Sequence, residues 1–193
     1  LERRMTTPAS GLITMKSVQD EFGIANPVTM AKFYNLAPGV PASGKITLTD
    51  LYNKSAIKSY QWVRVEFADN GVSGYANTAE IGITLNGAPV AVNGYSATSE
   101  YPANPINYAF DGNASTNWAA ATVNTTSQIL LAYSGVRNFN AVRIMPGLTY
   151  QNVGTIRVYG SNTSNSAGFV LIREFGGLAG PGWVQGQYRV FSL

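Results

Sequence analysis

The sequence predicts an all-β fold, an antiparallel β-sandwich, preceded by a small segment of short helices and turns. Two observations predict it. From residue 60 onward, apolar and polar residues alternate with a period of two in short runs separated by Gly and Asn. Before that point, short segments with helical spacing are separated by Pro and Gly. Because the composition changes between Lys54 and Ser59, we expect a segment over 1–55 and a domain over 60–193.

The first segment contains a weak repeat of a β-branched residue, a Thr and an apolar residue, at 13–15, 28–30 and 46–48. Each Thr can cap a helical turn by accepting a hydrogen bond from an exposed backbone N–H. Over 15–22, Val18 and Phe22 share a helical face, and Gly23 supplies a left-handed stop. A segment of about 55 residues buries little by itself, which predicts docking onto the domain or onto another protein.

The alternating runs of the second part predict seven or eight short strands. In the first run Val63, Val65 and Phe67 share one face, which we expect to line the core. Many short strands with turns between them are typical of a sandwich. The runs cover residues 61–67, 80–85, 128–133, 141–145, 155–160, 169–175 and 187–193.

Composition excludes several classes of function. The chain has no Cys and no His, so disulfides, thiol nucleophiles, Ser-His-Asp triads and the usual zinc sites lack their parts. Its net charge is +3, and apart from the pair Arg3 and Arg4 the Lys and Arg residues occur singly, which argues against nucleic acid as a partner. No apolar run approaches the roughly 18 residues of a membrane span, and no apolar signal core begins the chain, so we expect no membrane insertion.

Sugar hydrolysis requires two carboxylates that flank the scissile bond. The ten acidic residues offer no convincing pair, since Glu66 and Glu100 stand alone in the sequence. We therefore expect no enzyme activity.

The first segment contains "MKSVQDEFGIANPVTMAKFYN" followed by "GKITLTDLYNKS". This stretch resembles the short N-terminal segment of many structural proteins of tailed bacteriophages, over about the first 55 residues. The resemblance implies a virion component that is assembled in the bacterial cytoplasm and present in several copies or as a homo-oligomer. Residues 1–55 would then attach the protein to other virion proteins.

The second part contains "NYAFDGNASTNWAAA", followed by "VRIMP", "IRVYGSN" and "FVLIREF". These residues resemble the discoidin-like domains, the coagulation-factor type C and galactose-binding carbohydrate-module family, over residues 94–193. Members of that family end with a further pair of strands, for which the chain has no counterpart before its last residue, Leu193. Residues 60–83 resemble this closing hairpin, placed ahead of the motif. The resemblance therefore implies a circularly permuted, discoidin-like jelly roll.

In the galactose-binding family a structural Ca²⁺ commonly takes oxygen ligands from the "DG" loop and a Glu from the final strand. An all-oxygen set with two negative charges suits a hard cation. The alternative is a hydrogen-bonded Asx-type turn without metal. We expect Trp118, which directly follows the loop, to lie in the core and not to be a ligand. Carried over to this sequence, the ligands are the carbonyls of Tyr108 and Ala79, the carboxylates of Asp111 and Glu80, an oxygen of Asn113, and the carbonyl and hydroxyl of Thr116.

In the same family ligands bind to loops at one end of the sandwich, near the cation loop. Sugar recognition needs an aromatic face together with amide or guanidinium groups. We expect a virion protein, tail or fibre associated, that binds host surface carbohydrate without catalysis; the alternative is a purely structural capsid-decoration, tail or collar protein. The candidate contacts are Tyr101, Asn117, Arg143, Tyr150 and Trp183.

Overall fold

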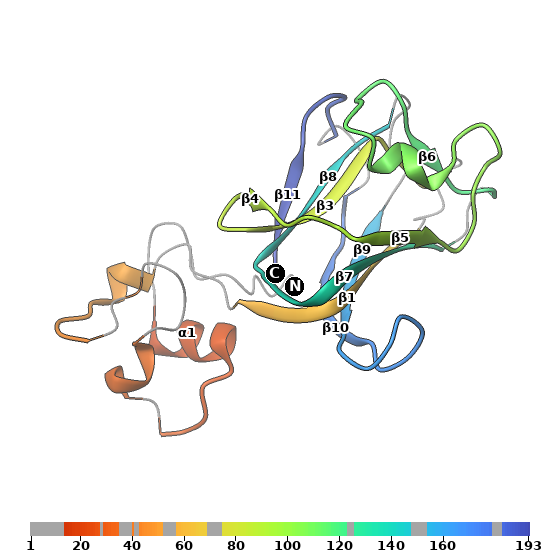
Figure 1. Ribbon diagram of the computed structural model, residues 1–193. Helices are drawn as coiled ribbons and strands as arrows, with labels where there is room; N and C mark the ends of the chain where they lie inside the picture. The colour runs from red at the N-terminus through yellow and green to blue at the C-terminus, as the bar shows by residue number, and fades with distance from the viewer. Residues whose placement is uncertain are drawn as a thin grey trace. The chain divides into compact units, whose positions relative to one another are not determined.

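The chain divides into two compact units (Figure 1). The first comprises Leu1–Lys58 with Ser192–Leu193, and the second comprises Ser59–Phe191. The division after residue 58 lies within the range 54–59 where the composition changes. The computed structural model describes residues 14–27, 29–34, 40, 43–51, 57–68, 75–122, 126–147, 154–178 and 183–193.

Three short helical elements form the described part of the first unit: α1 (Met15–Phe22), η1 (Met30–Phe33) and η2 (Leu48–Leu51). A Thr of the repeat precedes each of them. The Thr14 hydroxyl accepts a hydrogen bond from the Ser17 N–H at 3.0 Å, and Gly23 ends α1 in the left-handed region with φ +61°. The side chain of Thr29 makes no such bond. The predicted cap is thus formed at Thr14 and absent at Thr29.

A small apolar cluster holds these elements together. Val18, Phe33, Val40 and Leu51 are buried, and Phe22, Ile24 and Ile46 pack against them partly exposed. Val18 and Phe22 therefore share a face of α1, as their spacing predicts. Among the residues that the structure describes, this cluster has four buried apolar side chains.

Two antiparallel sheets account for most of the second unit, and Figure 1 shows them as two layers. One has the strand order β10-β9-β1-β7-β5 and the other β11-β8-β3-β4, while β2 and β6 form a separate ribbon. The first sheet consists of β1 (Lys58–Ala68), β5 (Gly94–Ala97), β7 (Ser127–Phe139), β9 (Thr155–Ser161) and β10 (Val170–Phe175). The other strands are β2 (Asn77–Thr78), β3 (Glu80–Leu85), β4 (Ala88–Pro89), β6 (Trp118–Ala119), β8 (Ala141–Met145) and β11 (Arg189–Ser192).

The core of this unit is built from one face of each sheet. Val63, Val65 and Phe67 of β1 are buried, which confirms the face assigned from the alternation. Burying an apolar side chain of this size stabilises a fold by about 1.5–3 kcal/mol. Further buried side chains are Ile81 and Ile83 of β3, Ile129 and Leu131 of β7, Val142 and Ile144 of β8, and Ile156 and Val158 of β9.

Each predicted run overlaps a strand, and the hairpin of β9 and β10 is present. The number of strands was underestimated, because β2, β4, β5 and β6 lie outside the predicted runs. The supposed closing hairpin over 60–83, however, is not a hairpin. Its two strands lie in different sheets, because β1 pairs with β9 whereas β3 pairs with β8 and β4. Alternation identifies a strand and its buried face, but it does not identify the strand's neighbours.

The ribbon of β2 and β6 anchors the "DG" loop to the rest of the unit. Asn77 lies opposite Ala119, its Oδ1 accepts from the Gly147 N–H at 3.1 Å, and its Nδ2 donates to the carbonyl of Tyr75 at 3.1 Å. Gly147 has no room for a side chain. A Cβ there would lie 2.4 Å from Asn77 Oδ1 and 3.0 Å from the Cβ of Asn117.

We predict that Gly147→Ala lowers the free energy of unfolding by about 1–3 kcal/mol, because the new methyl group overlaps two buried asparagines. Chemical denaturation of the whole protein measures the effect. Gly135→Ala in β7 is the matched control, since a Cβ there meets nothing within 4 Å. Equal losses of stability in the two variants would contradict the close approach at Gly147.

Candidate functional site

The "DG" loop, residues 110–118, is held by its own hydrogen bonds. Asp111 Oδ1 accepts from the Asn113 N–H and its Oδ2 from the Thr116 hydroxyl, both at 2.8 Å. Asn113 Oδ1 accepts from the Ser115 N–H at 3.0 Å. Gly112 sits at φ +74°, where a residue with a side chain would be strained. The described loop therefore has the Asx-type turn that was the alternative to a metal site.

Glu80, at the start of β3, lies against this loop. Its side chain is buried, with 8% of the residue exposed, and Oε1 has no hydrogen-bond partner among the described groups. Burial raises the pKa of the Glu80 carboxyl, and the negative charge of Asp111 adds to the increase. Hydrogen bonding from the backbones of Gly112 and Asn113 and the positive charge of Arg143 lower that pKa in part.

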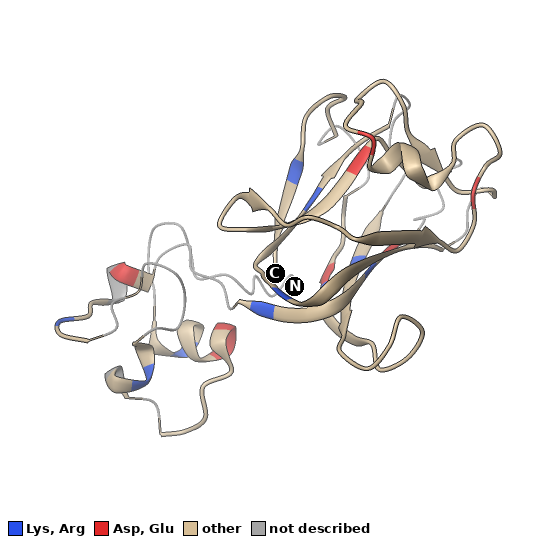
Figure 2. Ribbon diagram, in the orientation of Figure 1, with Lys and Arg blue, Asp and Glu red and all other residues tan. Residues whose placement is uncertain are grey.

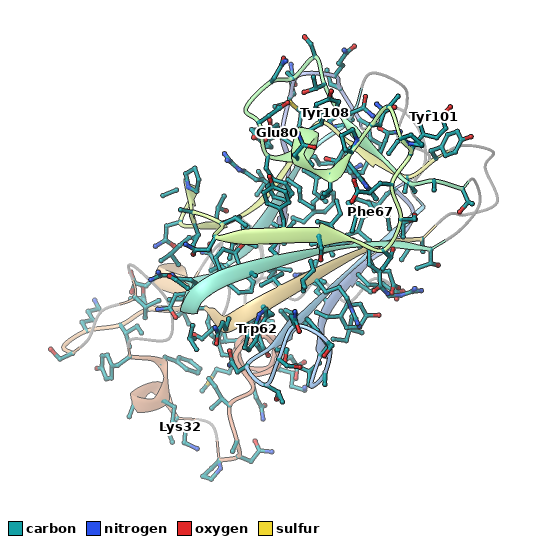
Figure 3. The ribbon with its side chains drawn as sticks, turned by 45° about the vertical axis from the view of Figure 1, so that its right-hand side comes forward. Lys32, Trp62, Phe67, Glu80, Tyr101 and Tyr108 are labelled. Carbon is teal, nitrogen blue, oxygen red and sulfur yellow. The ribbon has the colours of Figure 1, made fainter. Side chains whose placement is uncertain are left out.

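The structure thus brings together most of the predicted cation ligands. Asp111, Asn113 and Thr116 lie in one loop, and the Glu80 carboxyl lies against that loop. Tyr108 is in the short helix η3 (Ile106–Ala109) that leads into the loop. Ala79 immediately precedes Glu80, and its N–H donates to the carbonyl of Met145 at 2.9 Å. Figure 3 shows Glu80 and Tyr108 at the same end of the unit.

These oxygen donors are of the kind that a hard cation prefers, although both carboxylate oxygens of Asp111 and Oδ1 of Asn113 already accept hydrogen bonds within the loop. Two adjacent carboxylates repel each other, and a cation between them would favour both charged forms and give Glu80 Oε1 a partner. Over the described residues no group of three or more acidic side chains occurs, so the negative charge would come from Asp111 and Glu80. The remaining ligands would be neutral oxygens of Asn113, Thr116 and the backbone.

Arg143 and Tyr188 border this end of β3. The Arg143 guanidinium lies 4.3 Å from the centre of the Tyr188 ring, a cation–π contact. Arg143 lies opposite Gly82 in the β3–β8 register, and its Nε is buried without an acceptor in the described structure. Burial raises the pKa of Tyr188. The positive charge of Arg143 lowers that pKa in part, and the negative charge of Glu80 raises it. A positive group therefore stands beside the carboxylate pair.

The predicted sugar contacts differ in their surroundings. Tyr101 is exposed, whereas Asn117 is buried and donates from Nδ2 to the carbonyl of Trp118 at 3.2 Å. Trp183 is buried too, and its indole N–H donates to the carbonyl of Leu178 at 3.0 Å. The side chains of Asn117 and Trp183 are thus engaged inside the fold and unsuited to contact a ligand. Tyr150 lies outside the described residues.

Trp118 lies in the core, as expected. It is fully buried, its indole N–H donates to the carbonyl of Ser99 at 3.1 Å, and its ring centre lies 5.9 Å from that of Phe67. The tryptophan after the loop thus supports the sandwich rather than presenting a platform.

Tyr101 has an aromatic neighbour that the sequence did not reveal. The rings of Tyr75 and Tyr101 are tilted by 56° with their centres 5.8 Å apart, and these residues are 41% and 43% exposed. The Tyr101 N–H donates to the carbonyl of Ala119, the residue that lies opposite Asn77. Alternation gives no hint of Tyr75, because it stands before a two-residue strand. Figure 3 places Tyr101 at the same end as Glu80.

The charged residues are spread over the described chain without a basic stripe, as Figure 2 shows. Among these residues no helix has the length and apolar character needed to cross a membrane. Comparison of the chain with protein-family models, with curated proteins and with solved structures gives no match.

Proposed function

We propose that this protein is a non-catalytic structural component of a bacteriophage virion, in the tail or a fibre, and that its sandwich binds carbohydrate on the host surface. The observation that carries the binding proposal is the exposed pair Tyr75 and Tyr101. Exposed aromatic rings offer the apolar faces on which sugar rings stack. Weak binding by each copy would be multiplied by the number of copies in the particle.

The proposed sandwich is a circularly permuted discoidin-like domain. Residues 60–83 do not form the closing hairpin that suggested the permutation, but they supply β1, an internal strand of the larger sheet, and β3, an internal strand of the smaller one. A sandwich without them would have unpaired strand edges inside both sheets.

The proposed cation is a structural Ca²⁺. Asp111, Asn113, Thr116 and Glu80 would hold it with the carbonyls of Tyr108 and Ala79, and it would join the loop to β3. The bound ion would supply positive charge between the two carboxylates. The hydrogen bonds of Asp111 orient the loop, and the fold buries the carboxyl of Glu80.

Residues 1–55 are the proposed attachment to other virion proteins. The resemblance of this stretch to the N-terminal segment of phage structural proteins supports this role.

A second candidate is a purely structural capsid-decoration, tail or collar protein that uses the sandwich for contacts with neighbouring proteins. Exposed apolar residues on or beside the edge strands favour it, since such side chains are suited to protein contacts. They are Val170 and Leu171 of β10, Val190 of β11, and Val184.

We predict that the double variant Tyr75→Ala, Tyr101→Ala loses binding to bacterial surface glycans by about ten-fold or more, which corresponds to 1.4 kcal/mol. A glycan array with the whole protein identifies the ligand, and titration of that ligand measures the change. Tyr75→Phe with Tyr101→Phe keeps both rings and should retain most of the affinity. If the whole protein binds no glycan on the array, the structural alternative is favoured.

We predict that Ca²⁺ raises the melting temperature relative to chelator, because an ion that binds only the folded state stabilises it by about 2.7 kcal/mol at a hundred times its dissociation constant. Glu80→Gln should abolish this increase. In chelator the same variant should be at least as stable as the parent, because it removes a buried charge.

Glu174→Gln is the control for the loss of one negative charge, since Glu174 pairs with Arg157 in the other sheet. It should leave the calcium-dependent increase intact. An identical melting temperature in Ca²⁺ and chelator would rule out the cation.

A further inference from the structure

Two arginines on the outer face of the larger sheet have different surroundings. Arg157 of β9 pairs with Glu66 at 2.8 Å and with Glu174 at 2.5 Å. Glu66 also accepts from the Gln128 amide at 2.9 Å, so both of its oxygens are used. These two carboxylates raise the pKa of Arg157. Arg157 is thus paired with two carboxylates of the protein itself.

Arg64 of β1, on the same face, has no such partner. Its guanidinium carbon lies 4.4 Å from the centre of the Tyr159 ring and 4.5 Å from that of Phe169. Its Nε is buried without a hydrogen-bond acceptor, and within the described ranges Arg64 forms no ion pair. An unpaired buried donor is unfavourable, because it has lost its hydrogen bonds to water. The guanidinium therefore lacks an anion.

The two rings determine how an anion can reach Arg64. They lie against the guanidinium, and a planar cation so placed is held in one orientation. A ligand would have to bind the N–H groups at the edge of the guanidinium, and part of the entropy lost in ordering this long side chain is lost before the ligand binds. A carboxylate has the planar pair of oxygens that matches this edge.

Trp62 stands next to Arg64 on the outer face. The two residues are separated by one position in β1, so they point to the same side at a spacing of about 7 Å. Trp62, labelled in Figure 3, alternates with the buried Val63 and Val65 and therefore lies on the opposite face of β1. Leu171 of β10 lies opposite Tyr159 and is 53% exposed. The alternation of β1 thus places an indole on the same face as the guanidinium, whose two rings are those of Tyr159 and Phe169.

We propose that Arg64 and Trp62 form a binding site for a carboxylate-bearing sugar, a uronic acid unit of an acidic polysaccharide. The carboxylate would bind the Arg64 edge, and the adjoining ring would stack on Trp62, at a distance that suits neighbouring sugar units. A sugar fits better than an acidic peptide strand, because β1 is paired on both sides with β9 and β7 and offers no free backbone groups. This site is separate from the pair Tyr75 and Tyr101 and does not depend on it.

The three tryptophans make the site measurable in the whole protein. Trp118 and Trp183 are buried with their indole N–H groups bonded to carbonyls, whereas Trp62 is on the outer face. We predict that trigalacturonate shifts the indole ¹H–¹⁵N signal of Trp62 in a saturable way and leaves the other two unchanged. Trp62→Phe assigns the signal. The methyl ester of trigalacturonate, which has the same shape without charge, should bind about ten-fold more weakly or not at all.

Arg64→Gln should weaken binding of trigalacturonate by about ten-fold or more. Arg64→Lys keeps the charge but loses the planar fork, and it should weaken binding similarly. The signals of the buried Trp118 and Trp183 show whether Arg64→Gln disturbs the fold. If it does, Arg64→Lys replaces it as the variant that tests the site. Arg137→Gln is the matched control, because Arg137 is an arginine of the same sheet whose guanidinium bonds to the Ser134 hydroxyl.

Several outcomes would overturn the proposal. One is the absence of any shift of the Trp62 signal. Another is an equal loss of affinity for trigalacturonate in the Arg64→Gln and Arg137→Gln variants. A third is full affinity in Arg64→Lys, which would indicate unspecific attraction of charges. The variant Tyr75→Ala, Tyr101→Ala should bind trigalacturonate as the parent does. If that variant loses binding while Arg64→Gln retains it, the acidic sugar binds at the tyrosine pair and the Arg64 site is wrong.

Discussion

The pairing of β2 with β6 is the interaction on which the candidate site depends. It joins residues 77 and 78 to residues 119 and 118, although about forty positions separate them in the chain. Two residues after this ribbon, Glu80 meets the "DG" loop, and two residues before it, Tyr75 meets Tyr101. One short ribbon therefore places both the carboxylate pair and the aromatic pair. The hydrogen bonds of Asn77 and the absence of a side chain at Gly147 hold it against β8 and the loop that follows.

The polar groups of the sandwich fall into two kinds. Arg157, Glu66 and Glu174 satisfy one another on the sheet surface and stabilise the fold with no need of a ligand. Other buried atoms lack a partner among the described groups, at Thr84, Ser127, Tyr133 and Arg143 and at the two residues for which a ligand is proposed, Glu80 and Arg64. Buried polar atoms in native proteins are nearly always paired, so each exception calls for a physical reason, and for Glu80 and Arg64 the proposed reason is a bound ion or ligand. They have opposite charge, which suits a cation at Glu80 and an anion at Arg64.

The sequence predicted the strands well because alternation reports burial directly: Val63, Val65 and Phe67 line the core as their spacing requires. It also brought Glu80 to the "DG" loop through the resemblance to discoidin-like domains. Strand partners were less predictable, as the false hairpin over 60–83 shows, since pairing depends on contacts far apart in the chain. For the same reason the sequence placed Trp183 on the surface, although it is buried. The contact between the rings of Tyr75 and Tyr101 also could not be predicted from neighbouring residues.

The position of β1 has a mechanical consequence. This strand begins at Lys58, where the first unit ends, and it is hydrogen bonded to β9 on one side and β7 on the other. Tension applied to the chain before Lys58 is transmitted to the larger sheet through β1. Backbone hydrogen bonds in antiparallel sheets lie perpendicular to the strands, so such a pull shears many of them together instead of opening them one by one. The chain thus enters the sandwich at a place where its sheet resists tension well.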